Sequence, residues 1–428
     1  MAISRLYKNF ESITKFKTMK YKAVKKLLIK TYHSLNEKQR SIILFFKEKL
    51  GEISKVSFAD FSDCAEKILV VKDPTEEIID LPQIYGFIKE GSMVVNFPEV
   101  ALWKFDNATV FGRSDFVLLN KKTIVWPKRT YYNFSKNLPQ DNFIYTYDYN
   151  HAYIRKAKRE KNVDVAFSLI GVGATIWSHV LCEYLPKLYT IRKVVSKESR
   201  RITVLVPEYG EGHIKDIIYN ELEKLDVDIL IVKNNEAVIA NTLYFMERVG
   251  RVTDHEVYVE IGDQVEPKLI TDLWKEHVSK PLIDKYVENK DKKPELKLYL
   301  ARRTDGHRMM TNNGEIEKYY QERGYIFVEP NKIPFKDVVN LFYHASIVAG
   351  PFSSAFTNLI FSRPGTKAFI MCNYTRAFEN FLEPIQQYYD IDINWLLGYD
   401  IDKKHPAHSS YYVPMDRMIE ACNKYGIC

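Results

Sequence analysis

A histidine and a glutamate four residues apart, His179 and Glu183, lie in the segment SHVLCEYLPKL. In a helix, residues at this spacing project from the same face about one turn apart. An imidazole and a carboxylate placed there can remove a proton from a substrate hydroxyl, with one group as the base and the other orienting it. Pro186 cannot donate a hydrogen bond to the carbonyl of Cys182, which predicts a bend in this helix. The spacing alone also fits an ordinary ion pair on a surface helix.

Three arginines follow a short apolar run in the segment LYLARRTDGHRMMTNN. Arg302 and Arg303 come at the end of the predicted strand 297–301, and Arg308 precedes a predicted helix that Asn312 or Asn313 would cap. Forked guanidinium donors match the oxygens of phosphate groups, so these arginines are candidates for holding two phosphates. Structural salt bridges are the other common role of loop arginines, and that alternative stays open.

The stretch from Ser346 to Cys372 reads as strand, tight turn, short helix and strand. Three hydroxyl residues, Ser353, Ser354 and Thr357, can cap the helix, and Pro364-Gly365 ends it. The start of such a helix presents free N–H groups and a positive dipole at the carboxyl edge of the sheet, where a nucleotide diphosphate can bind. The alternative is a plain βαβ crossover without a ligand.

Strand-like and helix-like segments alternate from residue 163 onward, which indicates a doubly wound α/β fold. The polar run 288–295 divides this region into two Rossmann-like lobes facing a cleft, the GT-B type of architecture. Short β-rich segments between 94 and 125 predict a small antiparallel meander instead. The predicted parts are a basic helical N-terminal region (1–61), a small β-rich accessory region (62–162), an N-terminal lobe (163–290), a C-terminal lobe (291–374) and a C-terminal helical tail packing back on the lobes (375–428).

Composition narrows the class of protein. The chain has 428 residues, a net charge of +7 and five scattered cysteines without a C-x-x-C spacing, so we expect several domains, reduced thiols and no zinc site. The uncharged stretch 165–178 is too short to cross a bilayer, and no secretory signal is apparent. Residues 1–30 hold nine Lys or Arg and one acid among aromatic residues, which fits either peripheral contact with an anionic membrane or a solvated basic helix. No nucleic-acid-binding motif is present.

Four of these segments, in this order, resemble glycosyltransferase family 61 over roughly Pro98 to Met371. PEVALWKFDNATVFG resembles the family's β-hairpins, SHVLCEYLPKL its H-x-L-x-E-x-L-P-[RK]-L helix, and LYLARR with Arg308 its strand-plus-arginine segment. GPFSSAFTNLIFSRPGTKAFIM resembles G-P-H-G-A-x-L-T-N-x-x-F-x-x-P-G-x-x-V. One departure stands out, because Phe352, Ser353 and Ser354 replace the family's His-Gly-Ala, so either the donor differs or activity is lost.

The resemblance implies an inverting transfer of a sugar from a nucleotide-sugar, most simply a UDP-sugar, to a glycan or lipid-linked glycan acceptor. Glu183 is the preferred base, with His179 as its substitute or partner. We expect no metal and no other cofactor, since the leaving diphosphate would be neutralised by the protein. We expect a cytoplasmic enzyme of capsule, lipopolysaccharide or related surface-polysaccharide synthesis, and an inactive scaffold subunit is the alternative. The residues implied to bind the donor are Arg302, Arg303, Arg308, Ser353, Ser354, Thr357, Asn358 and Lys367.

Overall fold

The computed structural model describes the following residues: 37–80, 83–86, 92–97, 99–125, 143–147, 151–246, 257–258, 264–265, 274–302, 309–373, 382–401 and 409–428. The chain divides into two compact units. The first comprises Met1–Lys55 and Tyr145–Lys156, and the second comprises Val56–Ile144 and Ala157–Cys428. In the first unit lie α3 (Glu37–Lys49), most of β9 (Ile144–Tyr147) and β10 (His151–Arg155).

Within the region 1–61 that was predicted to be helical, β1 (Ile53–Ala59) is instead a strand paired in parallel with β8 (Thr123–Val125). Residues 1–36, and with them the basic segment 1–30, lie outside the described residues. No helix in the part of the chain that the structure describes is long and apolar enough to span a bilayer.

The first sheet of the large unit begins with four parallel strands in the order β13 (Val227–Val232), β12 (Ile202–Pro207), β11 (Arg159–Ser168) and β14 (Glu236–Met246). The helical segments α6 (Trp177–His179), η3 (Val180–Tyr184) and α7 (Leu185–Val195) follow β11, and α8 (His213–Leu222) follows β12. The alternation of strands and helices predicted from residue 163 onward is confirmed here from β11 to β13.

The β-rich region before β11 is not a separate layer. The meander of β6 (Val100–Phe111), β7 (Val117–Leu119) and β8 is antiparallel, as expected. However, β6 also pairs antiparallel with β14, in register from Leu102–Met246 to Phe111–Ala237, so the meander extends the first sheet. On its other side β6 pairs with β2 (Glu66–Lys72), and the short helix α4 (Phe61–Cys64) precedes β2. The first sheet thus contains strands from both sides of residue 163. The domain limits 62–162 and 163–290 remain predictions.

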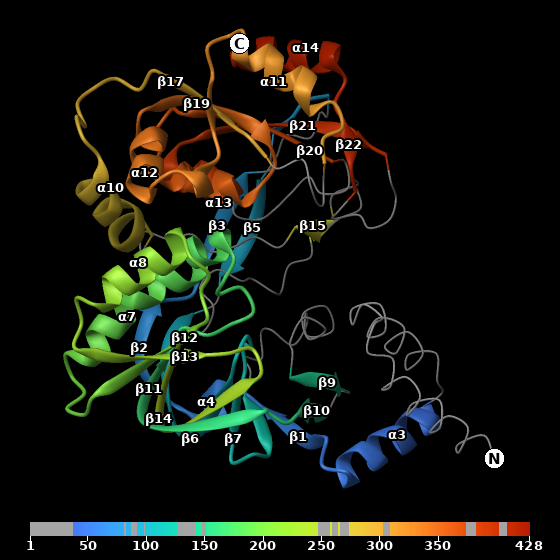
Figure 1. Ribbon diagram of the computed structural model, residues 1–428, viewed down its shortest axis with the longest axis vertical. Coiled ribbons are helices and arrows are strands. Elements are labelled where there is room, and N and C mark those ends of the chain that lie inside the picture. Colours follow the sequence, from blue (N-terminus) through green and yellow to red (C-terminus); the bar gives the residue numbers. More distant parts are fainter. Residues whose placement is uncertain are drawn as a thin grey trace. The chain divides into compact units, whose positions relative to one another are not determined.

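The second sheet is parallel and Rossmann-like. Its order is β18 (Ile326–Val328), β17 (Leu296–Leu300), β19 (Ala345–Pro351), β20 (Lys367–Asn373), β21 (Asp392–Asp400) and β4 (Gln83–Ile84), with β22 (Tyr411–Tyr412) antiparallel to β21. If the strands from β17 to β21 are numbered 1 to 5 along the chain, their order in the sheet is 2-1-3-4-5. This is the order of a doubly wound sheet, and the order of the strands reverses between β17 and β19. Helices cover both faces (Figure 1).

Two layers of helices bury the faces of this sheet. One layer comprises α12 (Phe335–Tyr343), the 3₁₀ helix η6 (Ser354–Phe361) and α13 (Leu382–Tyr389), and the other comprises α11 (Asn313–Gln321) and α14 (Met415–Tyr425). Val339, Phe356 and Ile385 of the first layer belong to the same core cluster as Phe167 of β11 and Leu188 of α7. The helices of the two sheets therefore share one core.

The C-terminal tail is only partly helical, contrary to prediction. Strand β21 lies within 375–428 and is buried along Ile393–Leu397, so the tail supplies a central strand pairing with β20 rather than an outer helical layer alone. The helix α14 does pack back on the sheet, because Met418 and Cys422 contact the cluster around Phe369.

The remaining short elements are the antiparallel pair β3 (Thr75–Asp80) and β5 (Ser92–Phe97), the antiparallel pair β15 (Val257–Tyr258) and β16 (Gln264–Val265), the π-helical turn η4 (Lys275–Ser279) leading into α10 (Lys280–Tyr286), and the 3₁₀ turn η5 (Pro330–Lys332).

Candidate active site

The carboxyl ends of β17 and β19 meet where the strand order of the second sheet reverses, which is the usual ligand position in such sheets. Arg302, two residues beyond β17, donates from Nη1 to the backbone carbonyl of Phe352 at 2.8 Å. The two strands also approach closely at Gly350, whose φ is +149° and where a Cβ would lie 2.8 Å from the Leu300 carbonyl oxygen. The arginine is therefore held beside the start of η6.

The start of η6 is partly open to solvent. Ser353 caps it by accepting from the Ala355 N–H at 3.4 Å, and Ser354 is exposed. Thr357 is buried and its hydroxyl donates to the Ser354 carbonyl, while Asn358 is fully buried and donates to the Ala355 carbonyl at 2.9 Å. Ser353 and Ser354 thus lie at the edge of the sheet, whereas Thr357 and Asn358 shape the helix.

The structure does not bring Lys367 to this edge. It is the first residue of β20 and is level with Ile347, at the amino end of the sheet, whereas Pro351 is level with Met371 at the carboxyl end. The Lys367 ammonium donates to the Tyr425 carbonyl at 2.7 Å and so helps to hold the end of α14. Arg303 and Arg308 lie outside the described residues.

His179 and Glu183 do lie one turn apart on a continuous helical segment. His179 Nδ1 is 3.0 Å from Glu183 Oε1, and the side chains are 23% and 1% exposed, respectively. A solvent-exposed surface pair is therefore excluded for Glu183. His179 immediately precedes the π-helical turn η3, and Glu183 lies within it. The turn ends at Tyr184, two residues before Pro186. Such turns widen a helix and are frequent at functional sites.

A network that sequence reasoning missed holds this helix against the loop after β11. Asp115, between β6 and β7, accepts from the Val172 N–H at 3.2 Å and from the Tyr184 hydroxyl at 3.4 Å. A Cβ at Gly171 would lie 1.9 Å from the Tyr184 hydroxyl oxygen, so only glycine fits there. The sequence signal for this close approach is the glycine at 171, whereas the sequence around Asp115 gives no signal.

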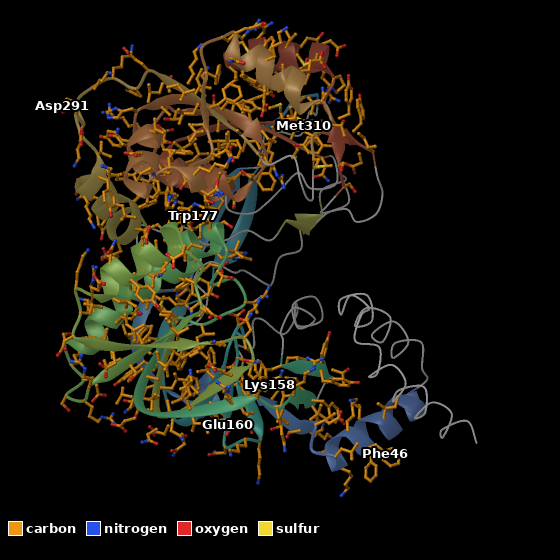
Figure 2. The ribbon with its side chains drawn as sticks, viewed as in Figure 1. Phe46, Lys158, Glu160, Trp177, Asp291 and Met310 are labelled. Carbon is orange, nitrogen blue, oxygen red and sulfur yellow. The ribbon has the colours of Figure 1, made fainter. Side chains whose placement is uncertain are left out.

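The helix that carries His179 contacts the helix that begins at Ser354. The indole Nε1 of Trp177 donates to Asn358 Oδ1 at 3.1 Å, and the Trp177 ring lies edge-on to Phe335 at 5.6 Å between centroids. Nearby, a His213 ring nitrogen lies 2.7 Å from the Ile333 carbonyl oxygen. Figure 2 shows Trp177 where the helices of the two sheets meet. The imidazole–carboxylate pair and the arginine at the end of β17 are thus brought to the same region of the large unit.

Residues 177–369 match the family model described as Glycosyltransferase 61. The match begins at Trp177 and includes His179, Glu183, Arg302 and the whole of η6, so both halves of the described site fall inside the matched region. A match of this kind indicates sugar transfer, with a sugar donor and an acceptor as substrates. It does not extend to the β-rich segment from Pro98 that we also compared with the family. No curated protein matches the chain.

The departure from the family motif at Phe352 has a clear structural consequence within the matched region. The Phe352 side chain is 4% exposed and its ring lies 5.6 Å from that of Trp395 in the core, while its carbonyl receives the Arg302 hydrogen bond. The position that is a histidine in the family motif therefore supplies no polar side chain to the edge of the sheet. The neighbouring hydroxyl groups of Ser353 and Ser354 remain at that edge.

Proposed function

We propose that this protein is an inverting glycosyltransferase that moves a sugar from a nucleotide-sugar to a glycan acceptor without a metal ion. The observation that carries the proposal is the hydrogen bond between Arg302 and the Phe352 carbonyl, because it places a guanidinium beside a helix start at the reversal point of a parallel sheet. The family match and the nearby His179–Glu183 pair support the same reading. In this proposal the fold is GT-B-like, with lobe 163–290 on the acceptor side and lobe 291–374 on the donor side.

The diphosphate of the donor would bind between Arg302 and the start of η6. When the bond to the sugar breaks, negative charge develops on the leaving diphosphate, and a preorganised guanidinium and backbone N–H groups stabilise it. Ser353 and Ser354 would add hydroxyl donors there, and Arg303 and Arg308 belong to the same proposed set. Thr357 and Asn358 would act by fixing the shape of η6, and the position of Lys367 supports no donor contact.

The proton of the acceptor hydroxyl would be taken by the His179–Glu183 pair. The exposures favour His179 as the group that reaches the acceptor, since its side chain is 23% exposed and that of Glu183 is 1% exposed. Glu183, 3.0 Å from Nδ1, would then orient the imidazole and stabilise its protonated form. This reverses the order of roles preferred from the sequence, in which Glu183 was the base.

The proposed biosynthetic pathway and cellular location of the enzyme follow from the class of acceptor. A glycan or lipid-linked glycan of capsule, lipopolysaccharide or another surface polysaccharide is the acceptor class we propose, with a UDP-sugar as donor. Synthesis of such a glycan at the inner face of the plasma membrane would fit the basic segment 1–30, whose cations and aromatic residues suit an anionic lipid surface.

A thermal-shift screen of the full chain against UDP-, GDP-, CMP- and ADP-sugars tests the proposal. A ligand that binds only the folded protein stabilises it by mass action, so the correct donor should raise the unfolding temperature in a concentration-dependent way. Arg302→Gln should abolish that shift. No shift with any nucleotide-sugar would contradict the proposed donor site.

A second candidate function is a binding or scaffold subunit with a degraded donor site. The burial of the Phe352 ring against Trp395 favours it, because the family's histidine is replaced there by a core residue. The same screen separates the two functions. The unfolding temperature of a scaffold should not change with any sugar-nucleotide. That of an enzyme with an altered donor preference should rise with one sugar-nucleotide, which an activity assay should then show to be hydrolysed or transferred.

A further inference from the structure

We infer that the large unit holds a second anion site, for a phosphate-bearing ligand, in a cavity between η4, α10 and the end of η6. The cavity has a volume of about 690 Å³ and is lined by four cationic side chains but only two acidic ones, Glu276 and Asp291. The cations are Lys275, Lys280, Lys290 and Arg363. Figure 2 shows Asp291 on the loop between α10 and β17, at the outer edge of this region.

Two of these cations are positioned by aromatic rings and by the backbone. The Arg363 guanidinium lies 4.5 Å from the centre of the Tyr343 ring and donates from Nη2 to the Lys290 carbonyl. The Lys275 ammonium lies 5.3 Å from the centre of the Tyr389 ring. Contacts of this kind hold charged side chains in place before a ligand arrives, which lowers the entropic cost of binding.

Two buried donors in the cavity wall have no hydrogen-bond partner among the described residues. They are the hydroxyl of Ser362, a residue only 6% exposed, and the Nε–H of Arg363. Buried polar groups in folded proteins are nearly always paired, so adjacent unpaired donors in a cationic cavity indicate a ligand with acceptor atoms. A phosphate group offers several acceptor oxygens and negative charge at once.

This cavity is distinct from the proposed transfer site. Ser353 and Ser354 begin η6, whereas Ser362 follows its last residue, so the length of the eight-residue 3₁₀ helix, roughly 16 Å, separates them. The cavity also lies at the amino end of β20, the edge of the sheet opposite Arg302. The inference therefore does not rest on the proposed sugar transfer. The volume is in the range of small-molecule sites and exceeds what a phosphate ion alone needs, so the phosphate would carry a further group.

Isothermal titration of the full chain with inorganic phosphate and with pyrophosphate, at millimolar concentrations, tests the inference. Ser362→Ala and Lys280→Gln should each weaken binding by about tenfold, as expected for loss of one charge-assisted hydrogen bond or one close cation. Lys285→Gln is the matched control, because Lys285 lies on the same helix but contacts Tyr286 instead of lining the cavity. It should bind as the wild type does.

Two further measurements separate a ligand site from a structural role and from the transfer site. In phosphate-free buffer Ser362→Ala should unfold at the same temperature as the wild type or higher, because it removes an unpaired buried hydroxyl. Arg302→Gln should leave at least one phosphate site with unchanged affinity. The inference is overturned if neither probe binds, if the cavity variants bind normally, or if Arg302→Gln alone removes all binding.

Discussion

Trp177 and Asn358 join a helix of the first sheet to a helix of the second sheet in the large unit through one hydrogen bond, from the indole Nε1 to Oδ1 at 3.1 Å. Trp177 begins the helix that carries His179 and Glu183, and Asn358 lies one helical turn beyond Ser354. Asn358 is fully buried, and its Nδ2 donates to the Ala355 carbonyl, so both ends of its amide are used. The relative position of the imidazole and the start of η6 thus depends on this pair.

Trp177→Phe should therefore destabilise the fold and weaken any transfer activity. The substitution keeps a ring against Phe335 but leaves a buried amide oxygen without its donor, at a cost of about 1–3 kcal/mol. Urea unfolding measures the loss, and a double-mutant cycle with Asn358→Ala isolates the pair. If the two single losses add fully in the double variant, the hydrogen bond contributes nothing specific.

Much of the second sheet could be predicted from the sequence, because buried parallel strands are continuous apolar runs with turn residues on either side. Strand β21 was missed because INWLLG, between aspartates, has no alternation and resembles a short helix. The position of Lys367 could have been predicted from the sequence. As the first residue of a parallel strand, it must lie at the edge of the sheet opposite the residues that follow β19.

Contacts between distant segments could not be predicted in the same way. Nothing in the local sequence of Asp115 or Trp177 shows what it contacts, because each partner lies tens of residues or more away in the chain. The π turn at 180–184 had only an indirect signal, Pro186, which lacks the N–H needed for a regular helix. The motif spacing of His179 and Glu183 predicted their contact but not the burial that distinguishes their roles.

Gly350→Ala should disrupt the edge at which Arg302 meets η6. The residue has a φ of +149°, and an added Cβ would lie 2.8 Å from the backbone oxygen of Leu300. We expect a loss of about 1–3 kcal/mol in the free energy of unfolding. Gly314→Ala is the matched control, since nothing lies within 4 Å of a Cβ there, and in helix α11 it should stabilise by about 0.4–1 kcal/mol. Equal effects of the two substitutions would contradict the strain at Gly350.

Glu198→Gln should make stability less dependent on acid pH. Hydrogen bonds from Arg200, at 3.0 and 3.1 Å, and from the Tyr244 hydroxyl lower the pKa of Glu198 from 4.5 to about 2. A lowered acid pKa stabilises the folded state above the ordinary value, and this contribution is lost as the pH falls from about 4.5 towards 2. The stability gap between wild type and variant should therefore be largest near neutral pH and shrink in acid.

Urea midpoints measured between pH 3 and pH 7 check this expectation. Glu211→Gln serves as the control, because it removes an exposed carboxylate that pairs with Lys215 on the surface. A gap for Glu198→Gln that stays constant across this range would show that its contacts do not depend on ionisation.

His179→Asn should abolish most transfer, if His179 is the base that contacts the acceptor. Loss of a general base typically lowers the rate by about 10²–10⁴-fold. Glu183→Gln should lower kcat to a comparable extent, because the amide cannot stabilise a protonated imidazole or hold its tautomer. Both variants should bind the donor normally in calorimetry, because the proposed diphosphate contacts come from Arg302, Ser353 and Ser354.

The pH profile of the two variants decides which residue is the base. If His179 takes the proton, residual activity of Glu183→Gln should still rise with pH as the imidazole loses its proton, and His179→Asn should lose that dependence. If Glu183 is the base, the reverse pattern is expected, with His179→Asn retaining the greater activity. Full turnover in both variants would remove the pair from the mechanism, and the 3.0 Å contact would then serve the helix alone.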